Sequence, residues 1–129
     1  MKSNVVGLAG EFRVMSELLL RGHNPAKSYL EDGADIILEN GIKVEVKSAH
    51  RLPQKRARAY LFDLRRGHHH STNNLGWCDY VICWCIDDNI FYVIPKEVIK
   101  PAVTLAIYNS SKSKSKYAFY KEAWNLLTH

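Results

Sequence analysis

Residues 33–47 read GADIILENGIKVEVK, and this stretch predicts the hairpin around which the rest of the chain is organised. Two runs rich in isoleucine and valine, residues 34–38 and 42–47, flank Asn40-Gly41, a dipeptide typical of tight turns between antiparallel strands. Because side chains alternate between the two faces of a strand, a shift of one residue in the pairing would exchange the faces. The length of the loop therefore decides which residues meet.

Two loop lengths are compatible with this turn. A two-residue loop would place Ile36 opposite Glu45 and would mix apolar and charged side chains on both faces. A three-residue loop over residues 39–41, with Gly41 in the left-handed conformation, makes one face entirely apolar. The pairs on that face are Leu38 with Ile42, Ile36 with Val44, and Ala34 with Val46. We therefore predict the three-residue loop.

The other face of the predicted hairpin is charged. It carries Ile37 opposite Lys43, Asp35 opposite Glu45, and then Lys47. Opposed carboxylates on neighbouring strands have Cβ atoms roughly 5 Å apart and repel each other. A divalent cation between them would remove the repulsion, since Mg²⁺ binds carboxylate oxygens. The alternative is an ordinary amphipathic hairpin whose exposed face carries solvated charges.

The order Asp35, Glu45, Val46, Lys47 on a hairpin resembles the PD-(D/E)XK nuclease superfamily, with Ala34 in place of the usual proline. The resemblance covers residues 4–64. It implies an α/β fold with a restriction-endonuclease-like core, in which a mixed central β-sheet with an α-β-β-β opening is flanked by helices. It also implies one or two Mg²⁺ or Mn²⁺ ions held by Asp35, Glu45 and the Val46 carbonyl, with Lys47 as a catalytic residue in phosphodiester hydrolysis.

Residues 4–22 are predicted to form the first helix. The apolar residues that follow the spacing of a buried stripe are Val5, Leu8, Phe12, Met15 and Leu19, and Gly22 offers a stop. Glu11 lies within this stripe, where a carboxylate is costly unless it is paired or binds a metal. Glu11 either lies at the margin of the stripe and reaches solvent or an arginine, or it reaches the metal site of the hairpin. Residues 7–11, GLAGE, resemble the first helix of archaeal Holliday junction resolvases, which implies the second role.

Composition limits the class of protein. The 129 residues, with 47% hydrophobic and 24% charged side chains, predict one globular domain spanning residues 1–129. No apolar run is long enough to cross a bilayer and no signal-peptide pattern is seen, so we expect no membrane partner and a cytoplasmic location. Cys78, Cys83 and Cys85 are expected to be buried thiols.

A basic run follows the hairpin, in a chain with a formal net charge of +5. Between His50 and His70, one acid, Asp63, stands against six cations: Arg51, Lys55, Arg56, Arg58, Arg65 and Arg66. We predict that these cations bind DNA phosphates, although a solvated loop explains the run as well. For His68 and its two histidine neighbours we predict a loop that contacts DNA phosphates or bases, with a solvated loop as the alternative. A zinc site with Cys78 is disfavoured because adjacent residues rarely point the same way, and the internal position argues against an expression tag.

The rest of the chain continues the α/β pattern. Strands are predicted at residues 59–64, 79–86, 90–94 and 103–108, with a helical turn at 95–100 and a terminal helix at 117–127. Residues 65–78 leave little room for the second helix of the superfamily, which is therefore shortened or missing. The terminal helix would present Tyr117, Tyr120, Trp124 and Leu127 as one stripe.

These features together predict a metal-dependent DNA endonuclease that acts as a homodimer, since two strands must be cut. Within the nucleases, the sequence favours a structure-selective enzyme similar to Holliday junction resolvases, with a small restriction or repair endonuclease as the alternative. A non-catalytic nucleic-acid-binding module is the alternative from a different class. It would have no use for paired carboxylates that face phosphate.

Overall fold

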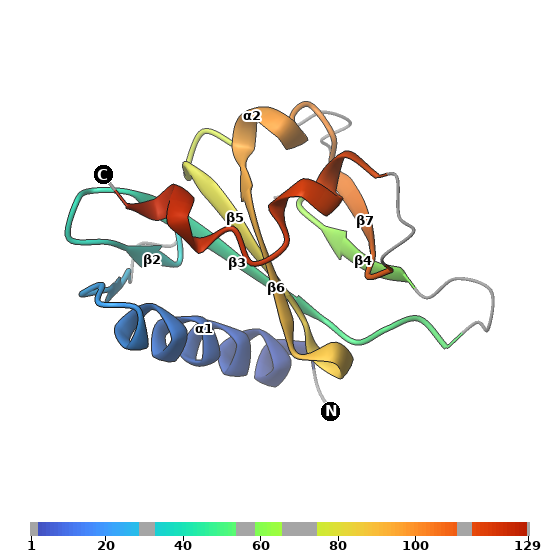
Figure 1. The fold of residues 1–129 in the computed structure, drawn as a ribbon, viewed down its shortest axis with the longest axis horizontal. Helices are drawn as coiled ribbons and strands as arrows, with labels where there is room; N and C mark the ends of the chain where they lie inside the picture. Colours follow the sequence, from blue (N-terminus) through green and yellow to red (C-terminus); the bar gives the residue numbers. More distant parts are fainter. Residues whose placement is uncertain (1–2, 29–32, 54–58, 66–74, 111–114, 129) are drawn as a thin grey trace.

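The computed structural model describes residues 3–28, 33–53, 59–65, 75–110 and 115–128 (Figure 1). Its elements, in chain order, are α1 (Ser3–Leu20), β1 (Ala26–Lys27), β2 (Ile36–Ile37), β3 (Lys43–Ala49), β4 (Ala59–Asp63), β5 (Tyr80–Cys85), η1 (Ile86–Asp88), β6 (Ile90–Pro95), α2 (Lys96–Ile99), β7 (Thr104–Tyr108), η2 (Lys116–Tyr120) and η3 (Trp124–Leu127), where η marks a short 3₁₀ helix. None of the described helices is long and apolar enough to cross a membrane.

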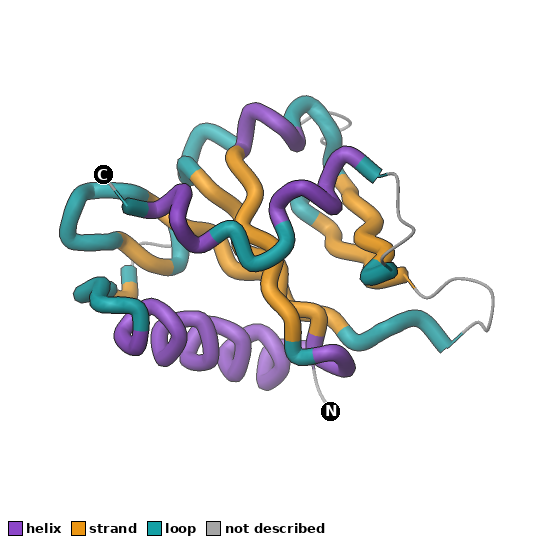
Figure 2. The backbone as a smooth tube through the Cα atoms, viewed as in Figure 1, coloured by secondary structure: helices purple, strands orange, loops and turns teal. Residues whose placement is uncertain are grey.

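The strands form two sheets. The central sheet has five strands in the order β1-β2-β3-β5-β6, with β3 and β5 parallel and every other neighbouring pair antiparallel. The mixed central sheet expected from the sequence is therefore confirmed. The second sheet pairs β4 with β7, and the helix α1 runs alongside the central sheet, well away from this small sheet (Figures 1 and 2).

Two apolar cores lie on the two faces of the central sheet. Val14 and Leu18 of α1 pack with Val44, Val46 and Ile82 in the first core. The second core joins the opposite face of the sheet to β4 and β7. Its members include Tyr60, Phe62, Leu64, Val81, Cys83, Cys85, Leu105 and Ile107. The prediction that the three cysteines are buried thiols is confirmed.

The register predicted for the first hairpin is confirmed. Ile36 lies opposite Val44 and Ile37 lies opposite Lys43. The Leu38 N–H donates to the Ile42 carbonyl at 2.9 Å, and Gly41 adopts a φ of +88°. The reason is that only this register turns the apolar side chains toward one core.

The first arm of the hairpin is shorter than predicted. β2 contains only Ile36–Ile37, and Ala34 does not pair with Val46 but packs in the core on the opposite face of the sheet. In place of a ladder bond, Asp35 Oδ2 accepts the Val46 N–H at 2.7 Å. The aspartate side chain thus takes over the hydrogen bonding of β3 where β2 ends.

The predicted buried stripe of the first helix is wrong. Val5, Leu8, Phe12 and Leu19 are 43–58% exposed, whereas Val14 and Leu18 are 0% exposed. Both sides of α1 are apolar, so spacing alone does not select the buried side. The sheet covers the side with Gly10, where a Cβ would lie 1.8 Å from Ser48 Oγ.

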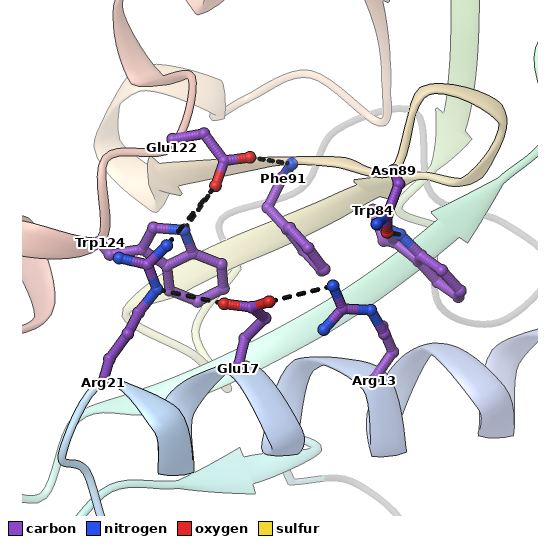
Figure 3. Close-up of polar contacts among 8 residues, drawn as sticks. All are labelled: Arg13, Glu17, Arg21, Trp84, Asn89, Phe91, Glu122 and Trp124. Carbon is purple, nitrogen blue, oxygen red and sulfur yellow. Dashed lines mark hydrogen bonds and ion pairs between the residues drawn. The ribbon is translucent and has the colours of Figure 1, made fainter.

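The predicted terminal helix is also wrong. The segment forms η2 and η3, and the chain breaks between them at Glu122, whose φ is +52°. Glu122 binds the edge of β6 instead: its N–H donates to the Phe91 carbonyl and its carboxylate accepts the Phe91 N–H, both at 2.8 Å. Its other oxygen accepts the Trp124 indole N–H at 2.8 Å (Figure 3). Hydrogen bonding to an edge strand has therefore replaced a continuous helix.

Candidate active site

Glu45 and Lys47 lie on the same face of β3, two residues apart, as predicted. Glu45 is 4% exposed and is the only charged residue that is buried among those the structure describes. Asp35 and Lys47 are half-buried. β3 therefore holds a carboxylate away from bulk water, with a lysine beside it on the same strand.

Asp35 and Glu45 meet through a side-chain hydrogen bond, as the opposed register predicts. Burial, this hydrogen bond and the charge of Glu45 raise the pKa of Asp35 to about 8, against the opposing effect of the Val46 N–H. A raised pKa with a carboxyl neighbour means that the pair holds a proton at neutral pH. A proton or a cation must offset the charge of this pair, and carboxylate oxygens are the ligands that Mg²⁺ prefers. The donor set therefore fits a divalent metal ion.

The carbonyl of Val46 is the third group predicted to bind the metal. The backbone N–H of Val46 points to the edge of β3 where Asp35 lies, because this N–H donates to Asp35 Oδ2. The N–H and C=O of one strand residue point to the same edge. The Val46 carbonyl is thus directed to the side of β3 that Asp35 occupies.

Glu11, on α1, interacts through its charge with both Asp35 and Glu45. Burial is the main cause that raises the pKa of Glu11, Lys27 opposes it, and the charge of Glu45 adds to it. The charge of Glu11 in turn raises the pKa of Asp35. Lys27 Nζ lies 4.0 Å from Glu11 Oε1. Within the described ranges, however, no three His, Cys, Asp or Glu side chains are grouped closely enough to hold a metal, so direct ligation by Glu11 stays a prediction.

Trp77 is a site residue that sequence reasoning missed. Its indole N–H donates to Glu45 Oε2. Trp77 lies in the turn that precedes β5, where Leu75 has a φ of +52°. Nothing in the local sequence of this turn indicates a partner in β3, more than thirty residues earlier.

The basic run is only partly described. The guanidinium of Arg51 lies 3.5 Å from the carboxylate of Asp88. The backbone N–H of Arg51 donates to the carboxylate of Asp87, which also lies 3.2 Å from His50 Nδ1. Arg65 binds Asp63 at 2.8 Å, and this guanidinium is the main reason that the pKa of Asp63 falls to about 2, with a smaller contribution from Lys47. Arg51 and Arg65, the two arginines of the basic run that the structure describes, thus each have an acidic neighbour. The other predicted DNA-binding residues, Lys55, Arg56, Arg58, Arg66 and His68, lie outside the described residues.

The raised pKa of Asp35 predicts a pH dependence of stability in the absence of metal. The folded state binds this proton more tightly than the unfolded state, whose pKa is near 3.8, so the free energy of unfolding falls as pH rises from about 4 to about 8. An asparagine at position 35 does not titrate, so the Asp35→Asn variant lacks this pH dependence of stability. The amide oxygen of the asparagine can still accept the Val46 N–H. We expect the variant to be more stable than the wild type by about 1–2 kcal/mol at pH 8 and equal to it near pH 4, by urea unfolding in EDTA. An equal difference at both pH values would contradict the prediction.

Comparison with known proteins finds similarity among solved structures. No protein-family model matches the chain, and neither does any curated protein. The structure of the bacterial homing endonuclease I-Ssp6803I matches with a TM-score of 0.80 and 21% sequence identity, over 98% of this chain and 93% of that one. This chain therefore has the fold of that endonuclease over nearly its whole length.

Proposed function

We propose that this chain is a metal-dependent DNA endonuclease of the PD-(D/E)XK type. The observation that carries the proposal is the hydrogen-bonded Asp35–Glu45 pair, next to Lys47 on β3. The fold shared with a bacterial homing endonuclease supports it, because the same architecture there belongs to a DNA-cutting enzyme.

The catalytic residues have distinct parts in this proposal. Asp35, Glu45 and the Val46 carbonyl would hold Mg²⁺ or Mn²⁺, and Glu11 would add negative charge from α1. When bound, the metal would polarise the scissile phosphate and lower the pKa of a water. Lys47 would orient that water or offset the charge that develops on the phosphate.

The DNA would be held through its phosphates by cations of the basic run, which gives affinity without sequence information. Arg51 and Arg65 are the described members of this group, and each would have to exchange its acidic neighbour for a phosphate or share it. We also propose that the enzyme is selective for four-way junctions and acts as a homodimer. A restriction or repair endonuclease is the alternative subclass.

Cleavage of labelled substrates tests the proposal. Linear duplex, single strand and four-way junction are each incubated with Mg²⁺, Mn²⁺ or EDTA. Cutting that requires metal supports an endonuclease, and the substrate that is cut selects the subclass. Binding that persists in EDTA without cutting of any substrate would instead indicate a non-catalytic nucleic-acid-binding module.

Trp77→Phe is predicted to weaken metal binding, because it removes the indole N–H that holds Glu45 Oε2 in place. Partners that orient a metal ligand typically change the affinity by about 10–100-fold, so we expect at least a ~10-fold higher dissociation constant for Mn²⁺ by calorimetry. Trp84→Phe is the matched control, since it also removes one indole N–H, which donates to Asn89 at 3.1 Å in the β5–β6 turn. Equal affinities in Trp77→Phe and Trp84→Phe would show that Trp77 does not position the carboxylate.

A further inference from the structure

The outer face of α1 carries no charge. Among the residues of this helix whose exposure is described, the exposed ones are Asn4, Val5, Gly7, Leu8, Ala9, Phe12, Ser16, Leu19 and Leu20, which we call the outer face of α1. Five of them are large apolar residues at 43–80% exposure. A surface helix normally presents its charged residues to water, so this helix departs from the rule on the side that faces solvent.

The charged residues of α1 lie on its flanks and turn toward the rest of the chain. Arg13 pairs with Glu17 at 3.0 Å, and Glu17 contacts Arg21 at 3.3 Å. The guanidinium of Arg13 stacks over Phe91 at 4.9 Å and that of Arg21 over Trp124 at 4.7 Å (Figure 3). These contacts tie α1 to β6 and η3. They leave an exposed surface that is mostly apolar and flanked by ion pairs, which is typical of an interaction site.

We propose that two copies of this chain associate through the outer face of α1, helix against helix, about a two-fold axis. A two-fold interface requires a surface that complements itself. On the outer face, the helical spacing places the large residues Leu8, Phe12 and Leu19 in one ridge, with the small residues Ala9 and Ser16 beside it. The large side chains of one copy can therefore pack over the small residues of the other, as ridges into grooves.

Charge favours a second copy as the occupant. Each chain has a formal net charge of +5, so two copies repel each other wherever cations face cations. Among the described residues, the cation that touches the outer face of α1 is Lys27, whose Nζ lies 5.1 Å from the centroid of the Phe12 ring and 4.0 Å from Glu11 Oε1, so a carboxylate offsets its charge. A nucleic acid would need cations on this face. Helices that lie on a membrane carry Lys and Arg beside the apolar face, whereas the described charges on the flanks of α1 are engaged in ion pairs.

The association rests on the proposed function only for its purpose, which is to place two active sites where two strands are cut. Helix α1 connects the proposed interface with the candidate active site. Its outer face would form the interface, and Glu11 on its flank interacts through its charge with Asp35 and Glu45. A contact made by a single pair of helices would be smaller than a standard interface of roughly 800 Å² per partner. We therefore expect a dimer that dissociates in the micromolar range.

Sedimentation of the whole chain, without DNA or metal, tests the proposal independently of cleavage. Over protein concentrations from about 1 µM to about 1 mM, the wild type should change from monomer to dimer. Leu8→Glu and Leu19→Glu should each raise the dissociation constant at least ~10-fold, since each buries a charge at the interface. Leu61→Glu is the control, because Leu61 is 52% exposed on β4, outside the outer face of α1. Circular dichroism would confirm that each variant is folded.

Salt and vesicles separate the other occupants. Dimerisation through an uncharged face should persist or strengthen in high salt, because screening reduces the repulsion between the two positive chains. A wild type that stays monomeric throughout, or a dimer that Leu8→Glu and Leu19→Glu leave intact, would overturn the proposal. Binding of a monomeric chain to vesicles of zwitterionic and anionic phospholipid, abolished by Leu19→Glu, would assign the face to a membrane surface instead and would likewise overturn it.

Discussion

Asp35→Asn is expected to lower metal-dependent DNA cleavage by at least about 100-fold, because loss of a ligand should cost no less than loss of a residue that merely orients one. The substitution changes little else. The amide has the shape of the carboxylate and its oxygen can accept the Val46 N–H, which Asp35 Oδ2 binds at 2.7 Å. The variant should also remain folded in EDTA, with a stability at or above that of the wild type at pH 8. Cleavage rates at saturating Mg²⁺, together with urea unfolding, check both parts.

Asp79→Asn is the matched control for this experiment. Asp79 also accepts a β3 backbone N–H with its carboxylate, from Lys43 at 2.8 Å, but it lies at the opposite end of the strand from Lys47. We expect Asp79→Asn to cleave within a few-fold of the wild type. If Asp35→Asn retained wild-type cleavage, or if Asp79→Asn lost cleavage to the same extent, the assignment of Asp35 to the metal would be wrong.

Gly10→Ala is expected to destabilise the fold by about 1–3 kcal/mol, since overpacking a close contact costs about that much. The added Cβ would lie 1.8 Å from Ser48 Oγ and 3.0 Å from Ser48 Cβ, so α1 would have to move away from β3. Urea unfolding at low protein concentration measures the change. A decrease of less than a few tenths of a kcal/mol would show that the helix can shift without cost.

Two further variants separate steric conflict from helix propensity. Gly7→Ala meets no atom within 4 Å and should stabilise the protein by about 0.5–1 kcal/mol, because alanine is the better helix former. Ser48→Ala removes the nearer of the two Ser48 atoms, an oxygen that is buried with no hydrogen-bond partner in the described structure. Gly10→Ala combined with Ser48→Ala should therefore recover most of the stability that Gly10→Ala loses.

The sequence predicts the hairpin, its three-residue loop and its register because each depends on local chemistry. Gly41 tolerates a positive φ, and the alternation of apolar and charged residues allows only one pairing that makes a uniformly apolar face. The strands β5 and β6 follow in the same way from β-rich apolar runs separated by Asp87-Asp88-Asn89, which becomes a turn with Asn89 at a φ of +50°. The opposition of Asp35 and Glu45 is a consequence of the register.

What joins distant segments could not be predicted in this way. Trp77 meets Glu45, and Asp87 and Asp88 approach Arg51, only because β5 lies beside β3 in the sheet. The count of charges along residues 50–70 therefore shows a basic run but not the acids that the fold brings to it.

The register of the hairpin and the pair of carboxylates on it follow from the amino-acid sequence, because turn chemistry and side-chain alternation act between near neighbours. Which side of α1 is buried depends on tertiary contacts, since both sides are apolar. The buried side is the one on which Gly10 allows close approach to Ser48 while Val14 and Leu18 pack against the sheet. Tertiary contacts also decided that residues 117–127 bend at Glu122, because hydrogen bonds to the edge of β6 stabilise the bend more than the apolar stripe stabilises a helix.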